Sequence, residues 1–283
     1  MSSSPVTLCG SLSLHPVSLG AAMHNAAYRA LGLPFVYVPF QVNEDGLAAA
    51  LDGMRALHIR GLGVSMPFKL TVMPLLDELH PLAAKIGAVN TIVNEAGRLV
   101  GHNTDADGAV RALAEVTAVR DLRVLVIGAG GAARAVVHGL VEAGAAVHLV
   151  NRTASKAEAL VAEVRRSRAG QPSLVELSAG GLEDLSRTER FGAVVNCSSA
   201  TMSGYGEELP IPDGALRPGL IVMDIVYKPL ETVLVRRARG RGAVTVQGGR
   251  MLLHQACRQF EIYTGRSAPF DAMATALEQA IGP

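Results

Sequence analysis

The sequence predicts an α/β fold in two domains, an N-terminal α/β domain and a doubly wound parallel sheet of the Rossmann type. Strand-length apolar segments alternate with helical segments from end to end, an order typical of parallel strands covered by helices. A chain of 283 residues is long for one hydrophobic core, so two domains are expected. With 49% apolar but only 4% aromatic residues, the composition suits Ala-, Val- and Leu-rich helices packed on buried sheets.

Strands and helices alternate through the first hundred residues. Pro67 follows a short apolar run and is expected to end that strand, because proline has no N–H for the sheet. The predicted elements are strands near Thr7–Cys9, over Phe35–Phe40 and over Gly61–Ser65, and helices over about Ala21–Leu31, over about Gly46–Leu57 and after Pro67.

A β-hairpin is predicted next. Residues 89–97 alternate apolar and polar side chains into a Glu-Ala-Gly turn, and Arg98–Asn103 form the returning strand. A helix from Asp105 to about Val116 then leads into the second half of the chain.

The alternation continues from Arg123 to about Val246 and then stops. Strands are expected to end near Asn151, Leu177, Asn196, Asp224 and Val246. The last helices, Gly249–Tyr263 and Phe270–Ile281, have no strand to pair with and are expected to return to the first domain. We therefore predict a substrate domain made of residues 1–105 and 246–283, and a dinucleotide domain of residues 106–245.

A glycine-rich turn follows the apolar strand that begins at Arg123. The pattern Gly128-x-Gly130-x-x-Ala133 is typical of a strand, a tight turn and a helix start, where backbone N–H groups can bind a pyrophosphate. Many helices begin after a glycine turn, so this pattern alone is weak evidence. The residues expected to line the pyrophosphate are Gly128, Gly130, Gly131 and Ala132.

The residues that follow the second apolar strand favour NADP over NAD. An NAD site carries Asp or Glu there, whereas this chain has Asn151. Asn151, Arg152, Thr153 and Lys156 offer an amide, a guanidinium, a hydroxyl and an ammonium to a 2′-phosphate. The alternative interpretation is that Arg152 and Lys156 only solvate a helix start.

Charge and motif patterns exclude several function classes. The formal net charge of +1 gives no electrostatic basis for a nucleic-acid or membrane partner. Arginine-rich runs at 165–168 and 236–241 lie late in helical patterns, where cations complement the helix dipole. The three cysteines form no CxxC pair and the eight histidines show no paired metal-ligand spacing, so we expect no metal.

The sequence also favours a cytoplasmic protein. No basic residue precedes Arg29, so the cationic region of a signal peptide is missing, and no uncharged apolar run reaches membrane-spanning length. The cysteine pattern agrees with a reducing compartment. No heptad or apolar stripe marks an interface, so monomer and homodimer stay open.

Two segments of the first domain carry polar residues suited to chemistry. Lys69 is expected near the start of a helix and beside Phe68, and both placements depress a lysine pKa, which suits a base that takes a proton from an alcohol. Asn103-Thr104-Asp105 places an amide, a hydroxyl and a carboxylate at a strand-to-helix junction. The alternative for this second segment is an ordinary N-cap.

Seven motifs together resemble the shikimate dehydrogenase family over nearly the whole chain. Any one of these motifs could arise by chance, but all seven occur in the family's order and spacing, which is highly specific. They are Ser65–Lys69, Gly87–Thr91, Asn103–Asp105, Gly128–Gly131, Asn151–Thr153, Asp224–Tyr227 and Met251–Gln255.

The resemblance implies an NADP-dependent hydride transfer between 3-dehydroshikimate and shikimate, a step of aromatic amino acid biosynthesis. It implies that Lys69 handles the hydroxyl proton and that Asp105 orients Lys69 and bonds the substrate hydroxyl. The implied contacts of this cyclic hydroxy acid are Ser18, Ser65, Asn90, Tyr227 and Gln255.

The N-terminal loop departs from the family pattern. Shikimate dehydrogenases usually carry Ser-x-Ser-Pro there to bind the substrate carboxylate, whereas this chain has Pro16 in place of the first serine and two extra residues between Ser18 and His24. The loop is more similar to those of the shikimate dehydrogenase-like paralogues. One lost hydrogen bond to a carboxylate weakens binding about ten- to a hundredfold.

Several interpretations of this loop and of the function stay open. Ser11 or Ser13, in the same loop, are alternative carboxylate ligands to Ser18. The alternative substrates are quinate and an amino-substituted shikimate. Alternative functions are an NADP-binding regulatory protein and a folate-linked dehydrogenase. The pair Lys69 and Asp105 argues against the regulatory protein, and the phosphate clamp combined with the Gln255 segment argues against the folate enzyme.

Overall fold

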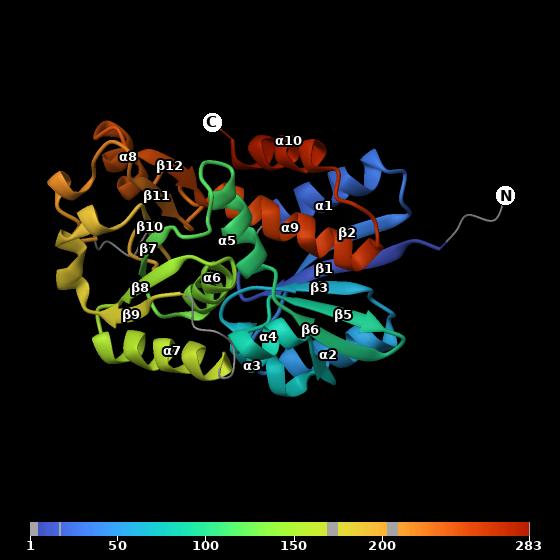
Figure 1. Ribbon diagram of the computed structural model, residues 1–283. Helices are drawn as coiled ribbons and strands as arrows, with labels where there is room; N and C mark the ends of the chain where they lie inside the picture. The colour runs from blue at the N-terminus through green and yellow to red at the C-terminus, as the bar shows by residue number, and fades with distance from the viewer. Residues whose placement is uncertain (1–4, 17, 169–174, 203–208, 283) are drawn as a thin grey trace. The chain divides into compact units, whose positions relative to one another are not determined.

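The computed structural model describes residues 5–16, 18–168, 175–202 and 209–282, and the chain divides into two compact units (Figure 1). Unit 1 comprises residues 1–104 and 255–283, and unit 2 comprises residues 105–254. Unit 2 extends beyond the expected boundary at residue 245 into helix α9 (Gly248–Thr264). The reason is local packing, because Met251 in the first turn of α9 belongs to the apolar core of unit 2.

Unit 1 contains a six-stranded sheet in the order β2-β1-β3-β5-β6-β4. All neighbouring strands run parallel except β5, which is antiparallel to both β3 and β6. The strands are β1 (Thr7–Ser13), β2 (Phe35–Gln41), β3 (Gly61–Val64), β4 (Glu78–Leu79), β5 (Thr91–Glu95) and β6 (Arg98–His102). The two-residue strand β4 has no counterpart among the sequence predictions.

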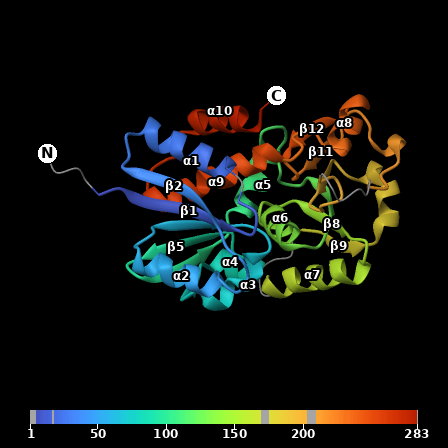
Figure 2. The same cartoon turned by 180° about the vertical axis from the view of Figure 1, so that it is seen from behind.

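Helices cover both faces of this sheet (Figure 2). One face is covered by α1 and α9, and α10 lies outside them. The other face packs on α2, α3 and α4, whose apolar side chains share a core with Leu12, Leu62 and Ile92. The helices of unit 1 besides α9 are α1 (Leu19–Ala30), α2 (Leu47–Ala56), α3 (Phe68–Thr71), α4 (Pro81–Ile86) and α10 (Phe270–Ile281), with a 3-10 turn at Met73–Leu75. Helix α10 packs against α1, so the expected return of the C-terminal helices to the first domain is confirmed.

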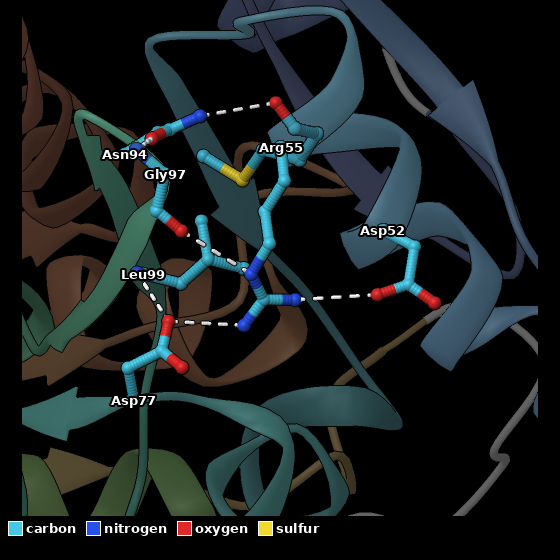
Figure 3. A network of polar contacts seen from close by, with 7 residues as sticks. Asp52, Arg55, Asp77, Asn94, Gly97 and Leu99 are labelled. Carbon is cyan, nitrogen blue, oxygen red and sulfur yellow. Dashed lines mark hydrogen bonds and ion pairs between the residues drawn. The ribbon is translucent and has the colours of Figure 1, made fainter.

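Polar contacts join the turn end of the β5–β6 hairpin to helix α2 (Figure 3). Its turn is the two-residue Ala96-Gly97, with φ of 54° and 96°, between the paired residues Glu95 and Arg98. Asn94 Nδ2 donates to the Met54 carbonyl at 3.0 Å, and Asn94 Oδ1 accepts from the Gly97 N–H at 2.7 Å.

Arg55 adds a second link at the same end of the hairpin. Its guanidinium donates to the Gly97 carbonyl at 3.3 Å and to Asp77 at 3.0 Å, and Asp77 accepts from the Leu99 N–H at 2.7 Å (Figure 3). The hairpin is therefore anchored at its turn, which leaves its other end to carry the polar residues described below.

Unit 2 contains a second six-stranded sheet, all parallel, in the order β12-β11-β10-β7-β8-β9. From β7 the chain adds β8 and β9 on one side and then β10, β11 and β12 on the other side, as in a doubly wound Rossmann sheet. The predicted fold class is therefore confirmed. Its strands are β7 (Arg123–Ile127), β8 (Ala146–Val150), β9 (Leu177–Gly180), β10 (Ala193–Asn196), β11 (Ile221–Asp224) and β12 (Val244–Gln247).

Successive side chains of the unit 2 strands point into two separate cores. Val124 and Val126 face the core formed with α5, α6 and α7, whereas Leu125 and Ile127 face the core formed with α8. The helices are α5 (Asp105–Ala114), α6 (Gly131–Glu142), α7 (Ala154–Ser167) and α8 (Val233–Gly240), and the 3-10 turns are η2 (Leu182–Ser186), η3 (Thr188–Arg190) and η4 (Asp213–Ala215).

One predicted strand is misplaced. Strand β9 begins at Leu177, where the sequence analysis expects a strand to end. The apolar residues Val175 and Leu177 suggest a strand end, but pairing with β8 runs from Val147–Leu177 to Val150–Gly180. The small residues of β9 carry no apolar signal.

In the described part of the chain, no helix is long and apolar enough to cross a membrane.

Burial of His24 in α1 predicts a loss of stability in acid. Its ring lies 4.4 Å from the Tyr37 ring, and burial lowers the pKa of His24 from 6.5 to about 4. As the pH falls, His24 binds a proton in the unfolded chain before it does so in the folded chain. The free energy of unfolding should therefore fall between pH 6.5 and pH 4, by up to about 3 kcal/mol. Burial also lowers the pKa of His102 to about 4.

The variant His24→Phe keeps the aromatic ring and removes the proton site. Urea unfolding at about pH 7 and pH 4.5 should show that this variant loses about half as much stability in acid as the unsubstituted chain, since His102 still titrates. An equal loss in both proteins would exclude His24 as a source of the acid sensitivity.

Candidate active site

The buried amide of Asn90 joins three segments of unit 1. Its Oδ1 accepts from the Thr104 N–H and the Thr91 hydroxyl, both at 2.8 Å. Its Nδ2 donates to Thr104 Oγ1 at 2.9 Å and to Gln255 Oε1 at 3.3 Å. The end of the hairpin, the segment before α5 and helix α9 therefore meet at one side chain.

A second glutamine of α9 extends this network. Gln259 lies one helical turn after Gln255 and donates from Nε2 to the Asn90 carbonyl at 3.2 Å and to Thr91 Oγ1 at 2.8 Å. Gln259 is not among the site residues expected from the sequence. Its signal is the four-residue spacing from Gln255, which puts both side chains on one face of a helix.

Lys69 is tied to the same network through its main chain. The Lys69 carbonyl accepts from the Val89 N–H at 2.8 Å, and Val89 directly precedes Asn90. Its side chain is half-buried on α3, a helix of one turn, so little of the dipole expected from a longer helix acts on it.

Ser65 lies between β3 and Lys69. It is exposed, and its carbonyl accepts from the Phe68 N–H at 3.0 Å in a turn that contains the cis peptide Met66–Pro67. The neighbouring Val64 N–H donates to the Asn90 carbonyl at 2.7 Å. The end of β3, and with it Ser65, is thus held beside the Asn90 network.

Asp105 begins α5 and directly follows Thr104. It is buried, with 6% of its surface exposed, and it lies in the first helical turn with Asp107. The Thr104 hydroxyl makes hydrogen bonds with Asn90 and with Gln255 Oε1 at 3.3 Å. The segment therefore does more than cap a helix, because Asn90 fixes the residue next to Asp105.

The glycine turn of unit 2 has the geometry that a dinucleotide requires. Gly128 has a φ of +106°, and a Cβ there would lie 3.2 Å from the main chain of Cys197 and Ser198. A Cβ built on Gly130 or Gly131 would meet no atom within 4 Å. The two glycines therefore border open space at the start of α6. No side chain caps α6 at Gly130, so its first N–H groups suit a pyrophosphate.

The residues expected to bind a 2′-phosphate lie at the carboxyl end of the neighbouring strand β8. Asn151 is half-buried, and its Nδ2 donates to the Thr153 carbonyl at 3.0 Å. Arg152, Thr153 and Lys156 are exposed, and Thr153 is the N-cap of α7 without a side-chain hydrogen bond to the helix. These groups fit a phosphate ester because they are accessible donors beside a helix N-terminus.

Tyr227 follows β11 on a loop that a buried carboxylate organises. It is half-buried. Asp224 accepts from Asn196 Nδ2 at 3.0 Å, from the Val226 N–H at 3.1 Å and from the Thr232 hydroxyl at 2.7 Å. Burial raises the pKa of Asp224, and these donors oppose that shift. Asn196 is expected from the sequence only as a strand end, whereas the structure bonds it to Asp224 of the Asp224–Tyr227 motif.

The three serines considered for the substrate carboxylate differ in exposure. Ser18 is exposed and caps α1 without a side-chain hydrogen bond, Ser11 is half-buried, and Ser13 is 7% exposed. Ser11 lies against the Tyr37 hydroxyl. Ser11 and Ser13 belong to strand β1 and not to the N-terminal loop expected from the sequence, and Val17 of that loop lies outside the described residues. Ser18 is therefore the serine whose hydroxyl is most accessible.

No metal centre is found in the described ranges. No group of three or more His, Cys, Asp or Glu side chains there could hold a metal ion.

Family comparisons cover most of the chain. Residues 15–92 match the shikimate dehydrogenase substrate binding domain. Residues 111–180 match shikimate / quinate 5-dehydrogenase, and residues 248–278 match the shikimate 5'-dehydrogenase C-terminal domain.

Individual relatives agree with these matches. A shikimate dehydrogenase (NADP(+)) from Methanothermobacter thermautotrophicus is 42% identical over 94% of this chain and 94% of its own length. Shikimate 5-dehydrogenase from Thermus thermophilus, solved with NADP(H) and shikimate, is 32% identical with a TM-score of 0.86, over 97% of this chain and 100% of that chain. Quinate dehydrogenase from Corynebacterium glutamicum, solved with NAD, is 30% identical with a TM-score of 0.83, over 96% and 99%.

Proposed function

The chain belongs to the shikimate dehydrogenase family, and from this premise we propose that it catalyses the reversible, NADP-dependent transfer of hydride between 3-dehydroshikimate and shikimate. The observation that carries the proposal is the Asn90 network. The buried Asn90 amide bonds Thr104, the residue before Asp105, and the Gln255 side chain, and the adjacent Val89 N–H bonds the Lys69 carbonyl.

Oxidation of a secondary alcohol needs a base for the hydroxyl proton and an acceptor for the hydride. Bound NADP supplies the hydride acceptor. Lys69 takes the proton from the reacting hydroxyl, and Asp105 orients Lys69 and helps to bind the substrate at its hydroxyl groups. Asn90 holds the residue before Asp105 through its bond to the Thr104 N–H, and the neighbouring Val89 N–H donates to the Lys69 carbonyl.

The remaining polar groups orient a polyhydroxy acid. Ser65, Gln255 and Tyr227 offer hydroxyl and amide groups to the ring hydroxyls, and the exposed Ser18 hydroxyl offers a donor to the carboxylate. Several fixed polar partners are what a site needs to discriminate between substrates that differ by one hydroxyl.

Quinate is the second candidate substrate because the N-terminal loop departs from the family pattern at Pro16. The test is the absorbance of reduced nicotinamide with NADP and either shikimate or quinate, with NAD in parallel. Faster reduction of NADP with shikimate supports the proposal, and faster reduction with quinate replaces its substrate. No reduction of either cofactor while NADP still binds would indicate the regulatory alternative.

We also propose a cytoplasmic location. Cys9, Cys197 and Cys257 are all buried free thiols, as expected in a reducing compartment.

The cofactor preference predicts the effect of Arg152→Ala. A guanidinium bond to a phosphate contributes about 1.5–3 kcal/mol, so the KM for NADP should rise about ten- to a hundredfold. The KM for NAD, which lacks the 2′-phosphate, should change little. Arg166→Ala, which removes an exposed arginine from the last turn of α7, is the matched control and should leave both values unchanged. Equal rises for both cofactors would remove Arg152 from the phosphate site.

A further inference from the structure

A pocket of about 270 Å³ lies in unit 2 at the amino ends of β7, β8 and β9. The glycine turn and Asn151 follow the carboxyl ends of β7 and β8, so this pocket lies at the opposite edge of the parallel sheet. It includes no residue of the proposed dehydrogenase site. Its lining includes a serine and an aspartate whose side chains both contact the same histidine.

The three side chains have the hydrogen-bond order of an activated nucleophile. His148 Nε2 lies 3.0 Å from Asp184 Oδ2, and His148 Nδ1 lies 2.8 Å from Ser178 Oγ. Because a carboxylate only accepts, the neutral imidazole carries its proton on Nε2. Nδ1 is then the acceptor for the Ser178 hydroxyl. A nucleophile bonded to a base that a third group orients is the arrangement that activates serine.

The surrounding residues hold this arrangement in place. His148 and Ser178 are direct neighbours across the β8–β9 pair. A Cβ on Gly180 would lie 2.1 Å from Asp184 Oδ2, so glycine there leaves room for the carboxylate to reach the imidazole. The His148 ring stacks on Phe191 at 5.9 Å. His148 and Asp184 are only 18% and 22% exposed, so both are shielded from bulk water.

The charges around the pocket indicate what it would take. Arg123, Arg187 and Arg190 line it, against the carboxylates of Glu176 and Asp184. Arg123 lies 3.5 Å from Glu176, and Arg187 lies 3.5 Å from Asp184, which also bonds His148. The lining therefore carries an excess of cationic groups, which favours an ester that bears a negative charge.

We propose that Ser178 is an activated nucleophile and that this pocket is a second reactive site for esters with an anionic group. Ser178 Oγ forms a bond to the acyl carbon as its proton passes to His148 Nδ1. The bond to the leaving alcohol then breaks, and that alcohol takes the proton from His148. Water hydrolyses the acyl-serine by the same proton path, so the products are a carboxylic acid and an alcohol.

Diisopropyl fluorophosphate tests the nucleophile directly. Ser178 Oγ would bond to phosphorus with loss of fluoride, and intact mass with peptide mapping would locate one added group on Ser178. His148→Gln and Asp184→Asn should slow this labelling, His148→Gln by about a hundredfold or more. Ser186→Ala is the matched control, because Ser186 is an exposed serine of η2 whose hydroxyl donates to the Glu183 carbonyl. Its labelling should equal that of the unsubstituted chain.

Labelling of Ser178 no faster than that of Ser186, or an unchanged rate in His148→Gln, would overturn the nucleophile. Hydrolysis of 4-nitrophenyl hydrogen succinate should exceed that of neutral 4-nitrophenyl acetate, and Arg190→Gln should reduce this preference. Equal rates with the two esters would overturn the anionic substrate class. All of these variants should retain NADP reduction with shikimate, which shows that they fold and keeps this test independent of the proposed dehydrogenase.

Discussion

Lys69→Ala is expected to lower kcat for shikimate oxidation by about a hundred- to ten-thousandfold, the range typical of a lost general base. The KM for shikimate should change much less, because hydroxyl and amide groups on other segments bind the substrate. Steady-state kinetics with saturating NADP would measure both constants. The affinity for NADPH, followed by the fluorescence of the protein-bound reduced cofactor, should be unaffected.

Lys85→Ala is the matched control for this experiment. Lys85 is an exposed lysine in the last turn of α4, in the same unit as Lys69. Its removal should leave kcat and KM near their original values. Lys69→Ala with a near-original kcat would mean that another group takes the hydroxyl proton, and the proposed mechanism would fail.

Local backbone chemistry made much of the fold predictable. The turn after β7 needs a positive φ and no Cβ at Gly128, so the sequence itself carries the signal. The β5–β6 hairpin was predictable because a strand-length segment leads into Ala96-Gly97, a pair that adopts positive φ in a two-residue turn. Strand β9 was misplaced because its small residues gain strand structure only from pairing with β8.

The candidate site was predictable residue by residue but not as an arrangement. Motif spacing indicated Asn90, Asp105 and Gln255, yet no local pattern says that one amide contacts residues at positions 104 and 255. Gln259 was missed for the same reason, since a glutamine on a helix resembles any solvated side chain until its partner is known. Non-local pairing, rather than residue type, was the missing information.

The arrangement around Asn90 predicts an effect on both stability and catalysis. Asn90→Ala leaves the buried Thr104 N–H without its acceptor, which should lower the free energy of unfolding by about 1–3 kcal/mol. It also frees the segment that positions Asp105, and a displacement of about 1 Å at a reacting group can reduce the rate about a hundredfold. We therefore expect kcat/KM for shikimate to fall about a hundredfold, measured at a temperature where the variant remains folded.

Asn94→Ala separates these two effects. Asn94 is the same residue type in the same hairpin, is also buried, and bonds the Met54 carbonyl and the Gly97 N–H at the opposite end of β5. Its loss of stability in urea unfolding should match that of Asn90→Ala, while its kcat/KM stays near the original value. Similar activity losses in both variants would mean that Asn90 acts only by stabilising unit 1, and its positioning role would be wrong.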